Sequence, residues 1–167
     1  MVPPLVPVDA RFWRMLSIRW QREPLSGAGA AVTGGRWNRP GQEALYLSVD
    51  HATAVSEYHQ NLVRPGTLAT YEVQSTAIVD FTNPATAQPY GSPAELLFAE
   101  WRSIVAIGKA EPLSWQVIDM LIAQGADGLL FPSAQLRGSK NLVLWRWSDK
   151  PGSGAHVGLL DPYGDLK

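Results

Sequence analysis

The sequence contains no cysteine, which excludes disulfide bonds, thiolate catalysis and a cysteine-ligated zinc site. It also has no apolar run near the roughly 20 residues that span a bilayer. The first residues, MVPPLVPVDARFW, lack the charged-then-apolar order of a secretory signal. Together these absences predict a cytoplasmic protein with no membrane partner.

Long runs of Lys or Arg are missing as well, and the net charge of the 167 residues is −1. Nucleic-acid binding through counterion release needs a basic face, so this composition argues against a direct nucleic-acid partner. A local basic cleft can still exist within a near-neutral total. With three histidines and no H-E-x-x-H pattern, no metal site is expected.

The remaining composition is that of an ordinary folded domain. Apolar residues make up 46% of the chain and charged residues 17%, enough to bury a core. The length fits a single domain over residues 1–167. Most of the seven tryptophans are expected in the core or in a cleft wall.

Short apolar segments alternate irregularly with helical patterns along the chain. Seven segments have the composition of strands: Phe12–Leu16, Ala44–Ser48, Leu68–Gln74, Ala77–Phe81, Gly128–Phe131, Leu142–Trp147 and Val157–Leu160. Helices are expected over about His51–Val63, from Ser92 or Pro93 through Ile104, and over about Ser114–Gln124. The absence of a regular βαβ rhythm predicts an α+β fold, with a mixed, mostly antiparallel sheet and flanking helices.

Two local expectations follow from this pattern. The glycines between Gln21 and Gly35 argue against a regular element there. On the helix capped by Asp50, the expected buried stripe is Val55, Tyr58 or His59, and Leu62, which leaves Glu57 off its centre.

Two glycine-rich motifs bear on chemistry. GAGAAV begins like a dinucleotide-binding loop, but Val32 stands where the third glycine belongs. GGRWN is more informative, because its two glycines permit close approach or positive φ and Arg36 suits phosphate oxygens. From residue chemistry alone, a turn with a solvated arginine explains GGRWN equally well.

Three further residues stand at suggestive positions but have ordinary explanations when taken singly. Tyr46 reads as a half-buried strand tyrosine, Glu57 as an exposed helix glutamate and Ser133 as a loop or capping serine. Trp145 and Trp147 alternate with Leu144 and Arg146, a pattern best explained by packing in the core or against a partner.

Taken together, three segments resemble the RES-domain family: SGAGAAVTGGRWNRPGQEALYLS, HATAVSEYHQ and GLLFPSAQLRGSKNLVLW. The Arg, Glu and Ser that name the family match Arg36, Glu57 and Ser133. The similarity extends from about Arg11 to Leu160, and GGRWN followed by P-G and Y-x-S is its most distinctive part.

The resemblance implies a function and a fold. Family members are toxins encoded beside a helix-turn-helix antitoxin, and their fold is similar to that of ADP-ribosyltransferases. They deplete NAD⁺ by hydrolysis or phosphorolysis, and some relatives transfer ADP-ribose to a protein. The resemblance therefore implies NAD⁺ as substrate, no metal, and a cognate antitoxin that blocks the cleft near Arg36.

The resemblance also assigns roles to residues. Cleavage of the nicotinamide–ribose bond passes through an oxocarbenium-like sugar, which Glu57 would stabilise. Tyr46 would hold the nicotinamide ring, and Arg36 the diphosphate or the adjacent ribose. Arg14 would be a second anion contact, and Ser133 would bind the ribose or position Glu57.

Several points stay open at this level. The acceptor is water, phosphate or a protein side chain, and the last choice would make the chain a mono-ADP-ribosyltransferase with a specific protein target. Tyr58, His59 and Gln60 follow Glu57 where family members often have apolar residues, so His59 is a candidate base. A non-catalytic interaction module or an RNA-directed toxin is a third hypothesis. The neutral charge and the lack of a basic aromatic stripe count against RNA. A purely structural role leaves the spacing of GGRWN, Tyr46 and Glu57 unexplained.

Overall fold

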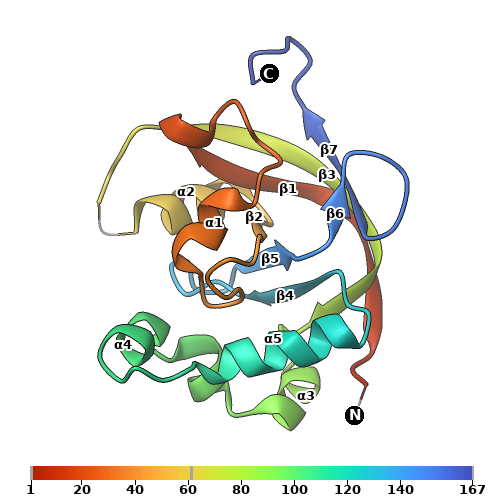
Figure 1. Ribbon diagram of the computed structural model, residues 1–167. Helices are drawn as coiled ribbons and strands as arrows, with labels where there is room; N and C mark the ends of the chain where they lie inside the picture. Colours follow the sequence, from red (N-terminus) through yellow and green to blue (C-terminus); the bar gives the residue numbers. More distant parts are fainter. Residues whose placement is uncertain (1, 61, 167) are drawn as a thin grey trace.

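The computed structural model describes residues 2–60 and 62–166, and its strands form one curved sheet (Figure 1). The seven strands are β1 (Leu5–Ser17), β2 (Leu45–Ser48), β3 (Gly66–Asp80), β4 (Gly128–Pro132), β5 (Lys140–Leu144), β6 (Trp147–Ser148) and β7 (Ala155–Leu160). Their order is β1-β2-β5-β4-β3-β7-β6, and β1 also pairs with β3, so five strands close on themselves. Only the β3–β4 and β6–β7 pairings of the described strands are parallel. The expected α+β class with a mixed, mostly antiparallel sheet is confirmed.

The two longest strands, β1 and β3, form a ribbon that joins both halves of the sheet. They pair along almost their whole length, with one register shift between Val6 and Val8. The first part of β3 pairs with β7 and its last residues pair with β4. The expectation of two separate strands around Ser75 was wrong, because β1 continues to pair across the polar interruption.

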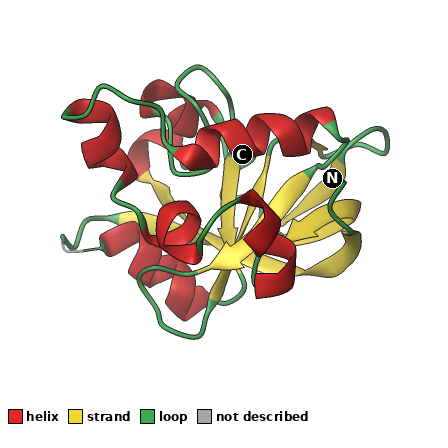
Figure 2. Ribbon diagram, turned by 90° about the horizontal axis from the view of Figure 1, so that it is seen from below, coloured by secondary structure: helices red, strands yellow, loops and turns green. Residues whose placement is uncertain are grey.

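Helices lie over one face of this sheet (Figure 2). They are α1 (Ala28–Thr33), α2 (His51–His59), α3 (Pro84–Ala87), α4 (Trp101–Ala106) and α5 (Leu113–Ala123), with a π-helical segment at Ala94–Phe98 and 3₁₀ turns at Ile18–Trp20 and Gln88–Tyr90. None of the described helices is long and apolar enough to cross a membrane.

Alternation along β5 divides the interior into two cores. Leu142 and Leu144 face a core enclosed by the strands, with Phe12, Tyr71 and Val157. Val143 points the other way, into a core completed by α5 and the π-helical segment. Trp145 and Trp147 pack against different cores, because the chain bends after Leu144 and the single expected strand Leu142–Trp147 becomes β5 and β6.

Two expectations about helices were wrong for reasons of packing. α1 lies inside the stretch where the glycines argued against a regular element. A Cβ at Gly27 would lie 2.6 Å from the Trp147 ring, and one at Gly29 would lie 3.0 Å from Trp20. These glycines therefore make room for tryptophans and do not break the helix. The helix expected from Ser92 through Ile104 is interrupted between the π-helical segment and α4.

The α2 helix begins as expected, with the Asp50 carboxylate accepting from the Thr53 amide at 2.7 Å. It ends at His59, where Gln60 has φ +47°, so Leu62 lies beyond the helix and is 73% exposed. The buried face consists of Thr53 and Ala54, and the expected stripe was wrong. Small residues let the helix approach the strands, and Glu57, one turn later, shares their face. Asn61, within the expected helix, lies outside the described residues, as do Met1 and Lys167.

Candidate functional site

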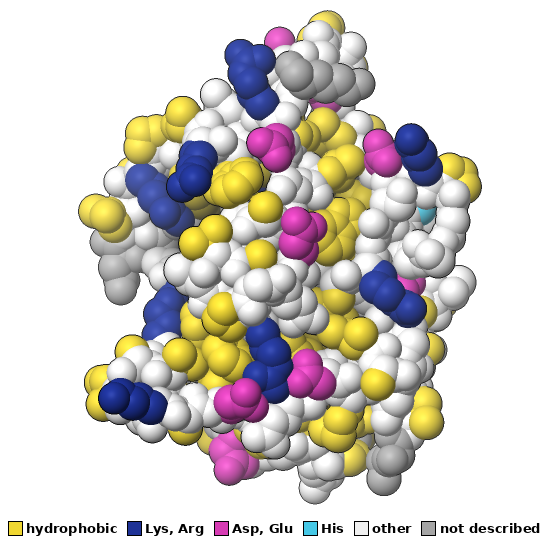
Figure 3. Space-filling model, viewed as in Figure 1, with side chains coloured by type: hydrophobic (Ala, Val, Ile, Leu, Met, Phe, Trp, Pro, Cys, Tyr) yellow, Lys and Arg dark blue, Asp and Glu magenta, His cyan; other side chains and the backbone are white. Residues whose placement is uncertain are grey.

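A cleft of about 450 Å³ is lined by residues of the strands and of α1, α2 and α4, and these helices lie on the left of Figure 1. Its walls come from β1, the GGRWN loop, β2, α2, α4 and the segment after β4. Figure 3 shows basic side chains around a notch on this side of the molecule. The cleft brings together four residues singled out in the sequence: Arg14, Arg36, Tyr46 and Glu57.

The GGRWN loop has a tightly determined shape. Gly34 has φ +74°, which favours glycine, and its neighbour Gly35 has no space for a side chain. A Cβ at Gly35 would lie 2.7 Å from both the Tyr46 hydroxyl and the Asn38 side-chain oxygen. The Gly35 amide donates to the Asn38 carbonyl at 2.9 Å, which closes the loop and directs Arg36 toward the cleft.

Tyr46 fastens this loop to β2. Its hydroxyl accepts from the Trp37 amide at 3.0 Å and donates to Asn38 Oδ1 at 2.9 Å. Burial raises the pKa of Tyr46 above its ordinary value, so the phenol is a neutral group near physiological pH. Its ring contacts Phe131 edge-on at 6.5 Å between centroids. Tyr46 therefore offers the cleft an aromatic surface while its oxygen is occupied by the loop.

Arg36 is half-buried and donates to the Ala99 carbonyl at 2.7 Å, between the π-helical segment and α4. Burial lowers the pKa of its guanidinium, an effect that the charges of Glu100 and Glu57 oppose. Because an arginine stays protonated under all ordinary conditions, a positive charge is held at this side of the cleft.

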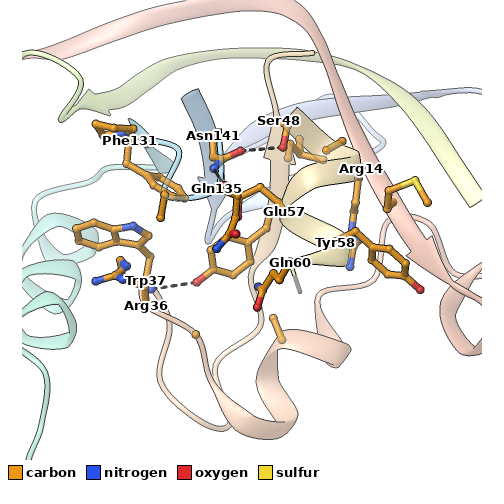
Figure 4. Close-up of a pocket in the computed structure, with 18 of the residues that line it drawn as sticks. Arg14, Arg36, Trp37, Ser48, Glu57, Tyr58, Gln60, Phe131, Gln135 and Asn141 are labelled. Atoms are coloured by element: carbon orange, nitrogen blue, oxygen red, sulfur yellow. Dashed lines mark hydrogen bonds between the residues drawn. The ribbon is translucent and has the colours of Figure 1, made fainter. Parts of the chain in front are cut away.

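Arg14 lies on β1 at the other side of Glu57 from Arg36 (Figure 4). It donates to the carbonyls of Pro24 at 3.3 Å and Ser26 at 3.1 Å. Burial lowers the pKa of Arg14, against the influence of the neighbouring Tyr71 hydroxyl. Its contacts within the chain are thus to neutral oxygens.

Two arginines that sequence reasoning missed also line the cleft. Arg64 lies over the Tyr58 ring at 4.2 Å, and Arg102 over the Trp101 ring at 4.8 Å. Among the described residues, none of the four cleft arginines is within ion-pair distance of a carboxylate. A net charge near zero is compatible with a local basic cleft, and the structure contains one. Its cations are available to an anionic ligand.

Glu57 supplies the carboxylate of the cleft, and its Oε1 is held by two neutral donors. The Ser133 hydroxyl and the Asn141 side-chain amide both donate to Oε1 at 2.6 Å. Ser133 is buried behind the carboxylate and is not among the described residues that line the cleft. It also accepts from the amides of Gln135 and Leu136, so the loop after β4 orients its hydroxyl.

A second set of hydrogen bonds ties α2 to the same loop. Asp50 Oδ1 accepts from the Thr53 hydroxyl at 2.8 Å, and Thr53 Oγ1 lies 2.5 Å from Ser139 Oγ. Since the loop from Ser133 to Ser139 contacts both the start of α2 and Glu57 near its end, the carboxylate is fixed relative to the sheet.

No local pattern in the sequence pointed to Asn141, which contacts Glu57, or to Ser48, which contacts Asn141. Period-two alternation places Ser48 on the same face as Tyr46, and the strand register places Asn141 opposite Ser48. Neither His51 nor His59 is among the described residues that line the cleft. The described residues also contain no group of three His, Asp or Glu arranged to hold a metal ion.

Comparison with known proteins identifies what this chain is similar to. A family model described as the RES domain matches residues 11–164. Toxin Res of Yersinia enterocolitica is 28% identical over 132 residues, which cover 79% of this chain and 81% of that protein. Prs ADP-ribosylating toxin of Sphingobium sp. is 42% identical over 48 residues, which cover 28% of this chain and 30% of that protein.

The fold has a counterpart among solved structures. A chain in the crystal structure of the M. tuberculosis MbcT–MbcA toxin–antitoxin complex superposes with a TM-score of 0.65 and 19% sequence identity. The match covers 97% of this chain and 91% of that chain, so the similarity of fold extends over nearly the whole chain.

Proposed function

This chain belongs to the RES-domain family, and from that membership and its cleft we propose that it is a toxin that cleaves the nicotinamide–ribose bond of NAD⁺. The single observation that carries the proposal is the set of four arginines around the held carboxylate of Glu57, none of which forms an ion pair with a carboxylate among the described residues. A dinucleotide joins an anionic diphosphate to a ribose that becomes cationic during cleavage. The cleft offers charge of the opposite sign for each part.

The positions of the arginines determine where the diphosphate lies relative to the ribose. Arg36 and Arg14 lie on opposite sides of Glu57, so the diphosphate binds on one side while the reacting ribose lies over the carboxylate (Figure 4). We assign the diphosphate to Arg36, whose planar guanidinium fits phosphate oxygens and already lies in the cleft wall. Tyr46 presents its ring, the part of the side chain that the loop leaves unused, to the nicotinamide.

The chemical step then needs only groups present in this cleft. The bond between C1′ and the ring nitrogen breaks, and its electron pair neutralises the departing nicotinamide. Positive charge develops on the ribose, where the Glu57 carboxylate stabilises it. A water oxygen attacks C1′ and passes its proton to Glu57, or a phosphate oxygen attacks as an anion with no proton to lose. NAD⁺ is depleted by hydrolysis in the first case and by phosphorolysis in the second.

The relatives support a toxin role and a protein that restrains it. One relative is named Toxin Res, and the structural counterpart comes from a toxin–antitoxin complex. We therefore propose a cognate antitoxin that covers the cleft near Arg36. The relative named Prs ADP-ribosylating toxin favours a second candidate, in which a protein side chain replaces water or phosphate as acceptor.

The test is nicotinamide release from NAD⁺ by purified protein, with and without phosphate. Glu57→Gln keeps the size of the side chain and removes its charge, so we expect release to fall about 100-fold or more. Glu72→Gln makes the same change at an exposed position on β3 outside the cleft, and its release should equal that of the wild type.

Each outcome of this test distinguishes between the possible activities. Release that depends on phosphate identifies phosphorolysis, and release without it identifies hydrolysis. If the wild type releases no nicotinamide alone but labels one cellular protein from NAD⁺, the transferase reading replaces NAD⁺ depletion. An inert wild type in both assays would contradict the proposed function.

A further inference from the structure

Next to Glu57 in the cleft wall lie two polar side chains, Asn141 and Ser48, to which the chemistry proposed above gives no role. Asn141 Nδ2 donates to Glu57 Oε1 at 2.6 Å, and Ser48 Oγ donates to Asn141 Oδ1 at 2.7 Å (Figure 4). Asn141 is 5% exposed and Ser48 is 4% exposed. These two residues form a series of hydrogen bonds that ends at the Glu57 carboxylate. Burial of polar groups is unfavourable unless they are hydrogen-bonded, so the presence of this pair requires an explanation.

The sheet register brings the pair together. Ser48 on β2 and Asn141 on β5 are directly opposite one another, so their side chains leave the sheet on the same face. The Ser48 hydroxyl supplies a hydrogen to Oδ1, which turns the amide nitrogen toward Glu57. A flipped amide would set Oδ1 against Oε1, two acceptors with no hydrogen between them. The amide therefore has one favourable orientation.

This arrangement divides the two oxygens of Glu57 into different roles. Oε1 accepts from both Asn141 and Ser133, whereas Oε2 has no hydrogen bond from any described residue. Both donors are neutral, so they orient the carboxylate without cancelling its charge, as an arginine or lysine would. The oxygen left for a substrate is Oε2.

We propose that Asn141, oriented by Ser48, is a positioning residue that fixes Glu57 so that Oε2 meets the ribose. The inference rests on the proposed function, since it assigns a step of that reaction to one oxygen. Strand β5 gives Asn141 a rigid attachment, whereas Ser133 belongs to a loop. Asn141 therefore sets the direction of the carboxylate, and Ser133 completes the coordination of Oε1.

The substitution Asn141→Asp tests this, because it keeps the shape and replaces the donor by an acceptor. At neutral pH two carboxylates face one another, Glu57 turns away, and kcat for nicotinamide release should fall about 10- to 100-fold. The KM for NAD⁺ should change less than about 3-fold, because the arginines still bind the diphosphate. At mildly acidic pH the new carboxyl is protonated and donates again, so the ratio of variant rate to wild-type rate should rise.

Three comparison variants make the test specific. Asn141→Ala removes the donor without adding charge, so it should lose rate without recovery in acid. Ser48→Ala frees the amide to turn and should lower kcat about 3- to 10-fold. Asn83→Asp makes the same substitution at the cap of α3, where either residue accepts from the Ala85 amide, and should follow the wild type at every pH.

The outcomes separate this inference from the proposed function. If Asn141→Asp matches the wild type at neutral pH, or raises only KM, the positioning role is overturned while NAD⁺ cleavage stands. If Asn141→Asp loses rate that acid does not recover, and its thermal unfolding is unchanged, the positioning role is also overturned. If the wild type releases no nicotinamide, the proposed function fails and this inference fails with it.

Discussion

The hydroxyl and the ring of Tyr46 have different roles in the cleft. Its hydroxyl is shared between the Trp37 amide and Asn38 Oδ1, so the oxygen serves the loop. Only the ring remains for a ligand. A tyrosine chosen for its acidity would show a lowered pKa, whereas burial raises the pKa of Tyr46.

Tyr46→Phe should therefore affect stability more than catalysis. It leaves two buried partners without their hydrogen bonds, which should lower the free energy of unfolding by about 1–3 kcal/mol. Nicotinamide release per folded molecule should fall far less than in Tyr46→Ala, which also removes the ring. Denaturant titration and the release assay measure the two effects, and Tyr163→Phe, at an 88% exposed position, is the control. Loss of release from fully stable Tyr46→Phe would mean that the hydroxyl acts in the chemistry.

The residues of the cleft were predictable to different degrees. Arg36, Tyr46 and Glu57 belong to a signature with fixed spacing, and all three line one cleft. The contact between Asn141 and Glu57 joins residues 84 positions apart and follows from the register of β2 with β5. No local pattern encodes that register. Arg64 and Arg102 follow no motif, and only the folded chain places them at the cleft.

Between elements, the key relationship is the attachment of the GGRWN loop to α5. The Trp115 indole donates to the Gly35 carbonyl at 2.8 Å. Arg39 forms ion pairs with Glu111 and Asp119 and lies over the Trp115 ring at 5.5 Å. The position of α5 therefore sets the backbone from which Arg36 reaches the cleft.

Trp115→Phe should loosen this attachment while filling most of the same space. Loss of the hydrogen bond should cost about 1 kcal/mol of unfolding free energy, and the KM for NAD⁺ should rise because Arg36 is less well placed. Trp147→Phe is the matched control, since it loses a similar 2.9 Å bond to the Leu25 carbonyl outside this loop. Equal KM values for Trp115→Phe and Trp147→Phe would show that α5 does not set the position of Arg36.

Elements were predicted well where the local sequence pattern is sufficient to specify the strand or helix. Helix α5 and strands β2, β4 and β7 lie within one or two residues of their expected bounds. The errors arose where a neighbour decides the outcome. β3 continues through Ser75 because β1 pairs along it. The glycines at α1 are required by its neighbours, since a side chain at Gly27 or Gly29 would clash with Trp147 or Trp20.

For the molecule as a whole, composition indicated the fold class but not the distribution of charge. A net charge of −1 is compatible with four cleft arginines that have no carboxylate partner among the described residues. The total is a sum over the surface, whereas ligand attraction depends on the local field in a cleft. The sequence could predict the irregular order of strands and helices, but the closure of five strands through β1 and β3 depends on long-range pairing.

The stability of the whole fold should depend on pH through Tyr71, which is fully buried between the strands and donates to the Pro24 carbonyl at 2.8 Å. Burial raises the pKa of Tyr71 from 10.0 to about 12, so the folded state keeps the phenol neutral while the unfolded chain ionises it. Below the unfolded pKa this tyrosine adds no pH dependence. Above it, the unfolded state gains about 1.4 kcal/mol per pH unit until the folded pKa is reached.

Tyr71→Phe should therefore be less stable than the wild type at neutral pH, because the Pro24 carbonyl loses a donor. It should also lose stability less steeply in alkali, by the equivalent of one proton. Urea titrations in steps from about pH 7 to about pH 11 measure both effects. Parallel curves for variant and wild type would show that Tyr71 ionises as easily in the fold as in the unfolded chain, and that its burial does not oppose alkaline unfolding.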